Sequence, residues 1–488
     1  MSTKPSGVSA DASQPEVGNT LDNIFKAEEI VFISRHPEAP KDSNLYDVFG
    51  LVEEAGDQGT IFRLLQSQIS SIPQPFLDEF LIEGLPDYLQ SSPSRRIHVV
   101  VSAGSGTGLA LDFYNRVLCR LLPGGEVYPS DPSMNSIERP EPNPHNLVVT
   151  QSADSIREFA REISREDEDG VQHTVVLLSG DGGIIDMLNG LVSVEGEGHN
   201  SEERLPLIAV LPLGTGNALF HSLHKSASAT SRFPAPSSLV QGLRTLFNGR
   251  AAALPSFKAE FSPGSRIITY KSPQPVEDSN TAAEVESHAD AVSHLYGAIV
   301  ASYGFHSQLV WESDTPEYRK HGAKRFGMVA QQLLKESHAY NAVVELSGRD
   351  GSNVRKLDRD RHAYILATMV SNLEKTFVIS PASEPLDGKL RLVHFGAVSG
   401  EKTMEIMTQA YNEGKHIGMR WTTEDGKEEG VGYEETGLVK ITTLEEDARW
   451  RKVCIDGTIV ELPQGGSMTV KTDDRPHLRV VVDKSLVR

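Results

Sequence analysis

The chain has little cysteine and no long apolar run. Its 488 residues include two cysteines, Cys119 and Cys454, which are too few for a disulfide framework, so a reducing compartment is expected. No stretch of about 18 apolar residues occurs, and a membrane-spanning helix is therefore not expected. The first 20 residues lack the apolar segment of a secretory signal. We expect a cytoplasmic protein whose contact with membranes is peripheral.

Positive charge is also scarce. The sequence has 47 Lys and Arg against 67 Asp and Glu, which gives a net charge of −20. Such a surface repels the phosphates of nucleic acids, so nucleic acid is not expected as a partner. The content of 38% hydrophobic and 23% charged residues suits a globular protein, and the length allows roughly two to four domains.

Local composition divides the chain into four parts. Residues 1–24 are rich in Ser, Pro, Gly and Ala and are predicted to be disordered. Residues 25–92 form a small N-terminal extension with strand-like runs and no chemical motif, and it ends at a Ser/Pro linker. A third part follows from 94 to 250, and a fourth from 251 to 488. Polar segments at 273–290 and 422–433 are predicted to be mobile loops within the fourth part.

Apolar runs alternate with amphipathic stretches in the third part. The runs at 97–101, 146–150, 174–178 and 207–211 are continuous, which indicates strands of a parallel sheet covered by helices. Turns at the carboxyl ends of such strands are where α/β sheets bind ligands. Beyond residue 250 the runs follow one another largely without helices. The predicted fold is an α/β lobe with a parallel sheet, followed by a mostly antiparallel β-sandwich lobe.

The turn Ser179–Gly183 joins one of these runs to an amphipathic stretch. Its glycines let the backbone approach a phosphate closely, and the N–H groups of the following helix attract anions. A carboxylate in that position, Asp181, could orient and deprotonate a hydroxyl that attacks a phosphate. The alternative is a tight turn whose aspartate only caps the next helix.

Two further turns resemble the first. In residues 212–217, the Thr215 hydroxyl and the Asn217 amide could serve the same site, although Asn217 could also be a plain helix cap. Residues 102–108 are neither a Walker A loop nor G-x-G-x-x-G, because GKS or GKT is missing and Leu109 stands where the last glycine belongs. The evidence for a phosphate site comes from the three turns together, because they follow strands of one sheet and are expected to face one crevice.

These motifs resemble the catalytic domain of the diacylglycerol kinase superfamily, and most closely its sphingosine kinase branch. Ser179-Gly180-Asp181-Gly182, followed by Asn189-Gly190-Leu191, is similar to the superfamily signature, and residues 211–219 (LPLGTGNAL) are similar to the LPxGSGNALA element of sphingosine kinases. Also similar are Thr150 with Glu158, residues 303–326 with their GF, ES and YR…RF elements, and Cys454-Ile455-Asp456-Gly457.

The resemblance implies roles for particular residues. Asp181 would be the base at a lipid hydroxyl. Arg319 and Arg325 would clamp the ATP phosphates, and Asp456 would approach the nucleotide or its Mg²⁺. Otherwise these arginines are surface charges, and Asp456 belongs to a hairpin turn. The remaining predicted ATP contacts are Ser102, Gly104, Ser105, Gly106, Thr150, Gly180, Gly182, Gly183, Gly214, Thr215, Gly216 and Asn217. No residue is assigned to the metal.

The sequence departs from the family pattern at several places, one of which is Ser155, where a histidine is usual. Residues 102–104 replace an Asn-Pro-basic turn, and Thr458 replaces a glutamate. Val310 stands where sphingosine kinases have the aspartate that pairs with the substrate amine, which should weaken selection for a free amine. Glu312 or Asp314 could bind the amine instead.

The predicted function is that of an ATP-dependent lipid kinase that uses Mg²⁺ and phosphorylates a hydroxyl of a sphingoid long-chain base. Diacylglycerol or ceramide are alternative substrates. A catalytically silent, lipid-binding member of the fold is an alternative of another class. An NAD kinase also shares a Gly-Gly-Asp-Gly turn, but the motifs after residue 300 disfavour it.

Overall fold

The computed structural model describes most of the chain. The described residues are 21, 24–38, 40, 44–56, 59–104, 106, 108–122, 145–166, 170–192, 202–225, 232–270, 287–423 and 426–487. The predicted disorder at the N-terminus falls almost entirely outside them, as does most of the predicted loop at 273–290. Among the described helices, none has the length and apolar character needed to cross a membrane.

A six-stranded sheet forms the first lobe, in the order β6-β5-β7-β8-β26-β9. Its first four strands in the chain are parallel to one another, as the continuous apolar runs predicted: β5 (Arg95–Val101), β6 (Asn146–Val149), β7 (Gln172–Ser179) and β8 (Leu207–Pro212). The C-terminal strand β26 (Arg479–Val482) runs parallel to β8, and β9 (Arg250–Ala253) pairs antiparallel with β26. Residues 479–482 therefore belong to the first lobe, although the sequence placed the whole of 251–488 in the second.

Helices cover both faces of this sheet. Alternate strand residues point to opposite faces, so Val175 and Leu177 pack in one hydrophobic cluster while Val176 and Leu178 pack in another. The first cluster is covered by α4 (Ser155–Glu166), α5 (Asp181–Val192) and α6 (Ala218–Leu223). The second is covered by α8 (Ser238–Asn248) and by a helix made of α2 (Ala110–Phe113), a π-helical turn (Tyr114–Leu118) and α3 (Cys119–Leu121).

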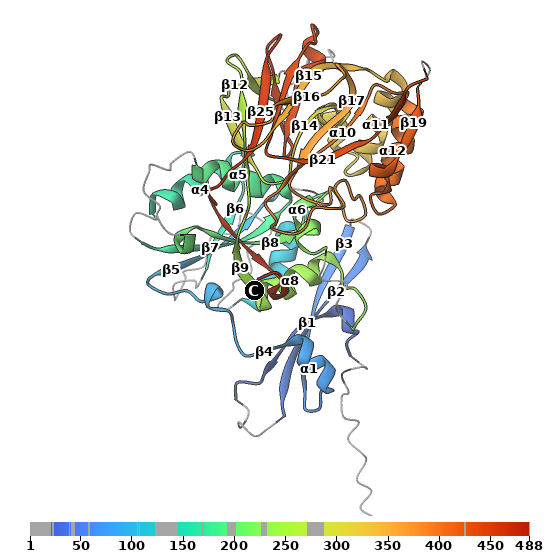
Figure 1. Cartoon of the computed structure of the whole chain (residues 1–488). Helices are drawn as coiled ribbons and strands as arrows, with labels where there is room; N and C mark the ends of the chain where they lie inside the picture. Colours follow the sequence, from blue (N-terminus) through green and yellow to red (C-terminus); the bar gives the residue numbers. More distant parts are fainter. Residues whose placement is uncertain are drawn as a thin grey trace, which may run out of the picture.

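The N-terminal extension is a four-stranded sheet packed against the first lobe. Its strand order is β3-β2-β1-β4, and Figure 1 shows it in blue, beside α8 and on the opposite side of the first lobe from the orange second lobe. The elements are β1 (Ile30–Arg35), β2 (Tyr46–Gly56), β3 (Gly59–Ile69), α1 (Gln74–Phe80) and β4 (Leu81–Ile82).

The second lobe is built on one 14-stranded sheet whose strand pairs are all antiparallel. Its strands are β10 (Phe257–Phe261), β11 (Arg266–Tyr270), β12 (Ser287–Ala291), β13 (His294–Gly297), β14 (Val300–Gly304), β15 (Tyr340–Ser347), β16 (Arg355–Lys356), β17 (Arg361–Thr368), β18 (Leu390–Gly396), β21 (Gly432–Thr436), β22 (Leu438–Thr443), β23 (Lys452–Ile455), β24 (Thr458–Glu461) and β25 (Ser467–Thr472). The antiparallel prediction agrees with this sheet.

Helices and a hairpin accompany that sheet. The helices are α9 (Phe305–Ser313), α10 (Pro316–Arg319), α11 (Lys324–Glu336) and α12 (Gly400–Tyr411). The predicted loop at 422–433 differs from the structure, because its described residues include strand β20 (Glu428–Gly430), which pairs with β19 (Arg420–Thr422), and the start of β21.

Candidate active site

The structure brings the three glycine-rich turns into backbone contact. A β-carbon on Gly106 would lie 2.3 Å from the carbonyl oxygen of Leu213, and one on Gly214 would lie 2.2 Å from the Cα atom of Gly180. Real side chains do not tolerate such distances, so the turns approach one another this closely only because these positions are glycine. The turns at the ends of β5, β7 and β8 therefore form one continuous backbone surface.

Asp181 lies within this surface, as the first residue of α5. Its carboxylate accepts hydrogen bonds from the backbone N–H groups of Ala218 (2.7 Å) and Leu219 (3.1 Å), which begin α6. The aspartate thus caps a helix, but not the helix that it starts. A carboxylate has about four acceptor positions, and these two bonds fill two of them. Burial raises the pKa of Asp181, and the two N–H groups partly offset that rise.

Asn217 shapes the turn after β8. It adopts a left-handed backbone conformation with φ 53°. Its side-chain oxygen accepts the N–H of Gly214 (3.0 Å), and its amide nitrogen donates to the Gly214 carbonyl (3.0 Å). The predicted nucleotide contact thus has its amide bonded inside the turn, and the side chain does not cap α6. Thr215 is exposed and Gly216 half-buried in the same turn.

The turn after β5 is fixed at its start. The Ser102 N–H donates to the Leu178 carbonyl of β7 (3.0 Å), and the Ala103 N–H donates to the Thr150 hydroxyl at the end of β6 (3.0 Å). Thr150 therefore orients this turn, beside which the resemblance placed it. Gly104 is exposed, and Ser105 lies outside the described residues.

Asp456 is buried and bound to backbone. It adopts φ 48° in the turn between β23 and β24. Its carboxylate accepts the N–H groups of Ala298 (2.7 Å), Ile299 (3.2 Å) and Val300. Burial raises the pKa of Asp456 to about 7, and the negative charge of Asp181 adds to that rise. The two carboxylates are thus close enough to influence each other, and Asp456 holds the start of β14 rather than presenting free oxygens.

The two arginines expected at the phosphates instead share one carboxylate. Asp314 accepts from Arg319 Nε (3.0 Å) and Nη2 (2.5 Å), and from Arg325 Nη1 (3.2 Å). In the parts of the chain that are described, no hydrogen bond or ion pair joins either arginine to a glycine-rich turn. The structure therefore places the two arginines together around Asp314, in the helices of the second lobe.

The carboxylates expected at a substrate amine are paired as well. Glu312 accepts from Gln308 (2.6 Å) and from Arg449 Nε (3.1 Å) and Nη2 (3.0 Å), while Asp314 is held by the two arginines. Val310, one helical turn earlier on α9, packs in an apolar cluster. The other members of this cluster are Ile268, Trp311, Cys454 and Ile459.

Two contacts between the lobes were not anticipated from the sequence. The side chain of Asn189 on α5 pairs with the backbone of Tyr296 on β13. The hydroxyl of Ser222 on α6 accepts the N–H of Asn372 (3.0 Å) and faces its carbonyl (3.3 Å). Asn189 belongs to the motif Asn189-Gly190-Leu191, which marked it as a residue of interest. Its partner Tyr296 lies 107 residues away and could not be inferred from that motif.

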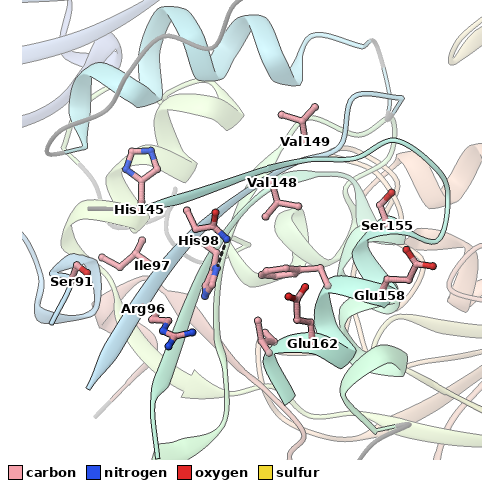
Figure 2. Close-up of a pocket in the computed structure, with 13 residues that line it drawn as sticks. Ser91, Arg96, Ile97, His98, His145, Val148, Val149, Ser155, Glu158 and Glu162 are labelled. Carbon is pink, nitrogen blue, oxygen red and sulfur yellow. Dashed lines mark hydrogen bonds between the residues drawn. The ribbon is translucent and has the colours of Figure 1, made fainter. Parts of the chain in front are cut away.

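A cavity of about 600 Å³ lies apart from the turns, between α4 and strands β5 and β6. Figure 2 shows Arg96, His98, Glu158 and Glu162 around it. His98 is buried, its Nε2 lies 3.0 Å from His173 Nδ1, and burial lowers its pKa to about 3, so the ring is neutral. None of the residues that line the cavity comes from a glycine-rich turn, so its position does not coincide with the candidate active site.

Comparison with known proteins agrees with the sequence motifs. Residues 133–245 match the diacylglycerol kinase catalytic domain. This kinase-like segment contains Asp181 and the turns after β7 and β8, whereas the turn after β5 and the second lobe lie outside it. Within the described residues, no group of three or more His, Cys, Asp or Glu side chains is arranged to hold a metal ion.

Other comparisons add little. None of the curated proteins matches the chain. Two solved structures from Bacillus anthracis str. Sterne, described as diacylglycerol kinases, one of them by inference, share 12% identity with it. Each alignment covers 81% of this chain and 100% of the other, with TM-scores of 0.47 and 0.43. Likeness at that level carries no argument about function.

Proposed function

We propose that the chain is an ATP-dependent lipid kinase with Asp181 as its base. The observation that carries the proposal is the position of this carboxylate, at the point where three glycine-rich turns meet and inside a segment that matches the diacylglycerol kinase catalytic domain. Turns with exposed N–H groups suit the phosphates of a nucleotide.

The proposed reaction uses the remaining acceptor positions of Asp181. An acceptor hydroxyl donates its proton to this carboxylate, and its oxygen forms a bond to the γ-phosphorus of ATP. The bond to the bridging oxygen breaks, and ADP leaves. Because burial raises the pKa of Asp181, the carboxylate is a stronger base than an exposed aspartate. Mg²⁺ that accompanies ATP would neutralise charge on the phosphates. Such an ion needs only one or two carboxylates from the protein, and Asp181 and Asp456 both already accept backbone N–H groups, so neither is assigned to it.

For the acceptor we propose a neutral lipid, such as diacylglycerol or ceramide, ahead of the sphingoid base first expected. A free amine needs an unpaired carboxylate nearby. Glu312 and Asp314 are each bonded to arginine, and Val310 packs among apolar side chains. The sphingoid base stays the second candidate, because the sequence motifs after residue 300 resemble that branch.

The test is turnover of ATP with diacylglycerol, ceramide, sphinganine and NAD, comparing the wild type with Asp181→Asn. We expect the wild type to phosphorylate a lipid and the variant to lose about 10²- to 10⁴-fold in rate. Thermal melting of the variant shows whether its fold persists. Equal rates would exclude Asp181 as the base, turnover of NAD alone would indicate an NAD kinase, and no turnover with any acceptor would support the catalytically silent alternative.

A further inference from the structure

We infer that the N-terminal module, defined as the described residues from 24 to 91, positions the glycine-rich turn after β5 and thereby tunes nucleotide binding. No role was expected for this module, because residues 25–92 carry no chemical motif. The second half of the inference rests on the proposed kinase function, whereas the first half concerns the protein without any ligand.

The module is part of the catalytic lobe rather than a tethered domain. Phe32, Leu51 and Phe62 are buried in the same hydrophobic cluster as the strands β5 and β7. The ring of Phe32 lies 4.8 Å from that of Phe247 on α8. Since the cluster is continuous, a change on the module side can be transmitted by packing to the sheet.

Polar bonds fix the module in one orientation. Arg244 on α8 donates to the carbonyl groups of Ile30 (2.8 Å) and Ala27 (2.8 Å), and its guanidinium lies 4.6 Å from the centre of the Phe80 ring. The Tyr88 hydroxyl donates to the Leu246 carbonyl (2.8 Å). A half-buried arginine that bonds two backbone carbonyls defines a direction as well as a contact, so these bonds restrain rotation of the module on the lobe.

The hairpin of β2 and β3 contacts the first residues after the turn. Phe62 on β3 packs edge-on against Phe113 on α2, with ring centres 5.1 Å apart and planes at 89°. At the tip of the hairpin, the position of a β-carbon on Gly59 lies 3.5 Å from Leu109 Cδ1. Leu109 directly precedes α2. The hairpin therefore supports the end of the turn that the backbone bonds at Ser102 and Ala103 do not hold.

The turn after β5 is packed closely against the rest of the candidate site. Gly106 lies against Leu213 and Gly214, and Gly214 lies against Gly180, the residue before Asp181. A shift of α2 would move the turn toward or away from that surface. The helix continues from α2 into a π-helical turn at Tyr114–Leu118, and such irregular turns often occur at functional sites.

The experiment compares Phe62→Leu with Phe76→Leu in the full chain. Both substitutions replace a phenyl ring with the same smaller side chain. Phe76, however, packs on Phe80 and Phe233 and not on Phe113 of α2. We expect Phe62→Leu to raise the KM for ATP severalfold with little change in kcat or in the KM for the lipid, and Phe76→Leu to leave all three near wild type. A variant that only lost stability would not separate KM from kcat in this way.

A second measurement is independent of the proposed function. Amide hydrogen exchange of the ligand-free protein is followed over residues 108–118, where we expect faster exchange in Phe62→Leu and wild-type exchange in Phe76→Leu. Unchanged exchange in Phe62→Leu, or equal effects of both variants, overturns the inference. The two variants can show the expected exchange while the wild type neither binds nor uses ATP. That outcome overturns the proposed function and the nucleotide half of the inference, whereas the positioning of α2 by the module stands.

Discussion

The side-chain amide of Asn189 pairs with the backbone of Tyr296 in both directions, as a neighbouring strand would. Its nitrogen donates to the Tyr296 carbonyl (2.8 Å), and its oxygen accepts the Tyr296 N–H (3.0 Å). Asn189 lies on α5, the helix that begins with Asp181, and Tyr296 lies on β13 of the other lobe. Val300 lies four residues after Tyr296, and its N–H donates to the Asp456 carboxylate. The amide pairing helps to set the orientation of the two lobes around Asp181, together with the bond between Ser222 and Asn372.

Replacing Asn189 tests this connection. Asn189→Ala removes both bonds to Tyr296 and leaves a partly buried carbonyl and N–H without that partner, so we expect a loss of about 1–3 kcal/mol in the free energy of unfolding. Asn189→Asp keeps an acceptor for the Tyr296 N–H but sets a carboxylate oxygen against the carbonyl oxygens of Tyr296 and Ile185, so it should lose at least as much. Urea denaturation of the three proteins measures this order, and an alanine variant as stable as the wild type would show that the pairing adds nothing.

The titration of Asp456 should appear in the stability of the protein. Its pKa is raised to about 7 in the folded state, against about 3.9 in an unfolded chain. Between these pH values the folded state binds the proton more tightly than the unfolded chain does. The stabilisation that Asp456 contributes is therefore greatest at low pH and is lost as the pH rises to about 7. The slope is up to about 1.4 kcal/mol per pH unit.

The control for that prediction is Asp456→Asn, which cannot titrate at this position. We expect the wild type to lose stability relative to this variant between pH 5 and pH 7, and the difference to level off above that range. Melting temperatures of both proteins across pH give the comparison. A constant difference at all pH values would contradict a raised pKa.

The pH dependence of turnover should report Asp181. Because burial raises its pKa, the carboxylate stays protonated, and unable to act as a base, to a higher pH than an exposed aspartate with its pKa of about 3.9. We therefore expect kcat/KM to fall with decreasing pH along a limb that lies above pH 4. A rate that stays constant down to pH 4 would argue against this base.

Releasing Glu312 should change the preferred acceptor. Arg449→Gln removes the guanidinium that bonds Glu312 and Glu336, which would leave a carboxylate near Val310 for a substrate amine. We expect the rate ratio of sphinganine to ceramide to rise. Arg63→Gln, which breaks the ion pair with Glu54 in the N-terminal sheet, is the matched control and should leave the ratio unchanged. An identical ratio in all three proteins would place Glu312 away from the lipid.

Long apolar runs made the first lobe predictable. The run at 174–178 lies inside β7 (Gln172–Ser179), and the run at 207–211 lies inside β8 (Leu207–Pro212). The apolar run at 376–380 has the composition of a short strand, but the Ile379 and Ser380 N–H groups both bond to the Ser371 carbonyl in a loop. A short apolar run is compatible with either state, and only the partner of its backbone decides between them.

Side-chain roles were harder to predict than the turns. Glycine signals its own backbone requirement, so the three turns were recognisable from local sequence. The partners of Asn189 and Asp456 are 107 and 156 to 158 residues away, and no local pattern indicates them. Arg319 and Arg325 were expected at phosphates because of a motif, and that role stays a prediction. Their shared partner Asp314 lies only five residues before Arg319, but the motif did not indicate it.

The place of β26 between β8 and β9 has a consequence for the order of folding. β26 is the only strand that joins β9 to the sheet of Asp181 in the described structure. During synthesis, β8 and β9 are complete long before residues 479–482 leave the ribosome, and their facing edges stay open until then. The first lobe is therefore expected to finish folding after the second lobe has been made, and a nascent chain that stops before residue 479 would expose an apolar strand edge to chaperones.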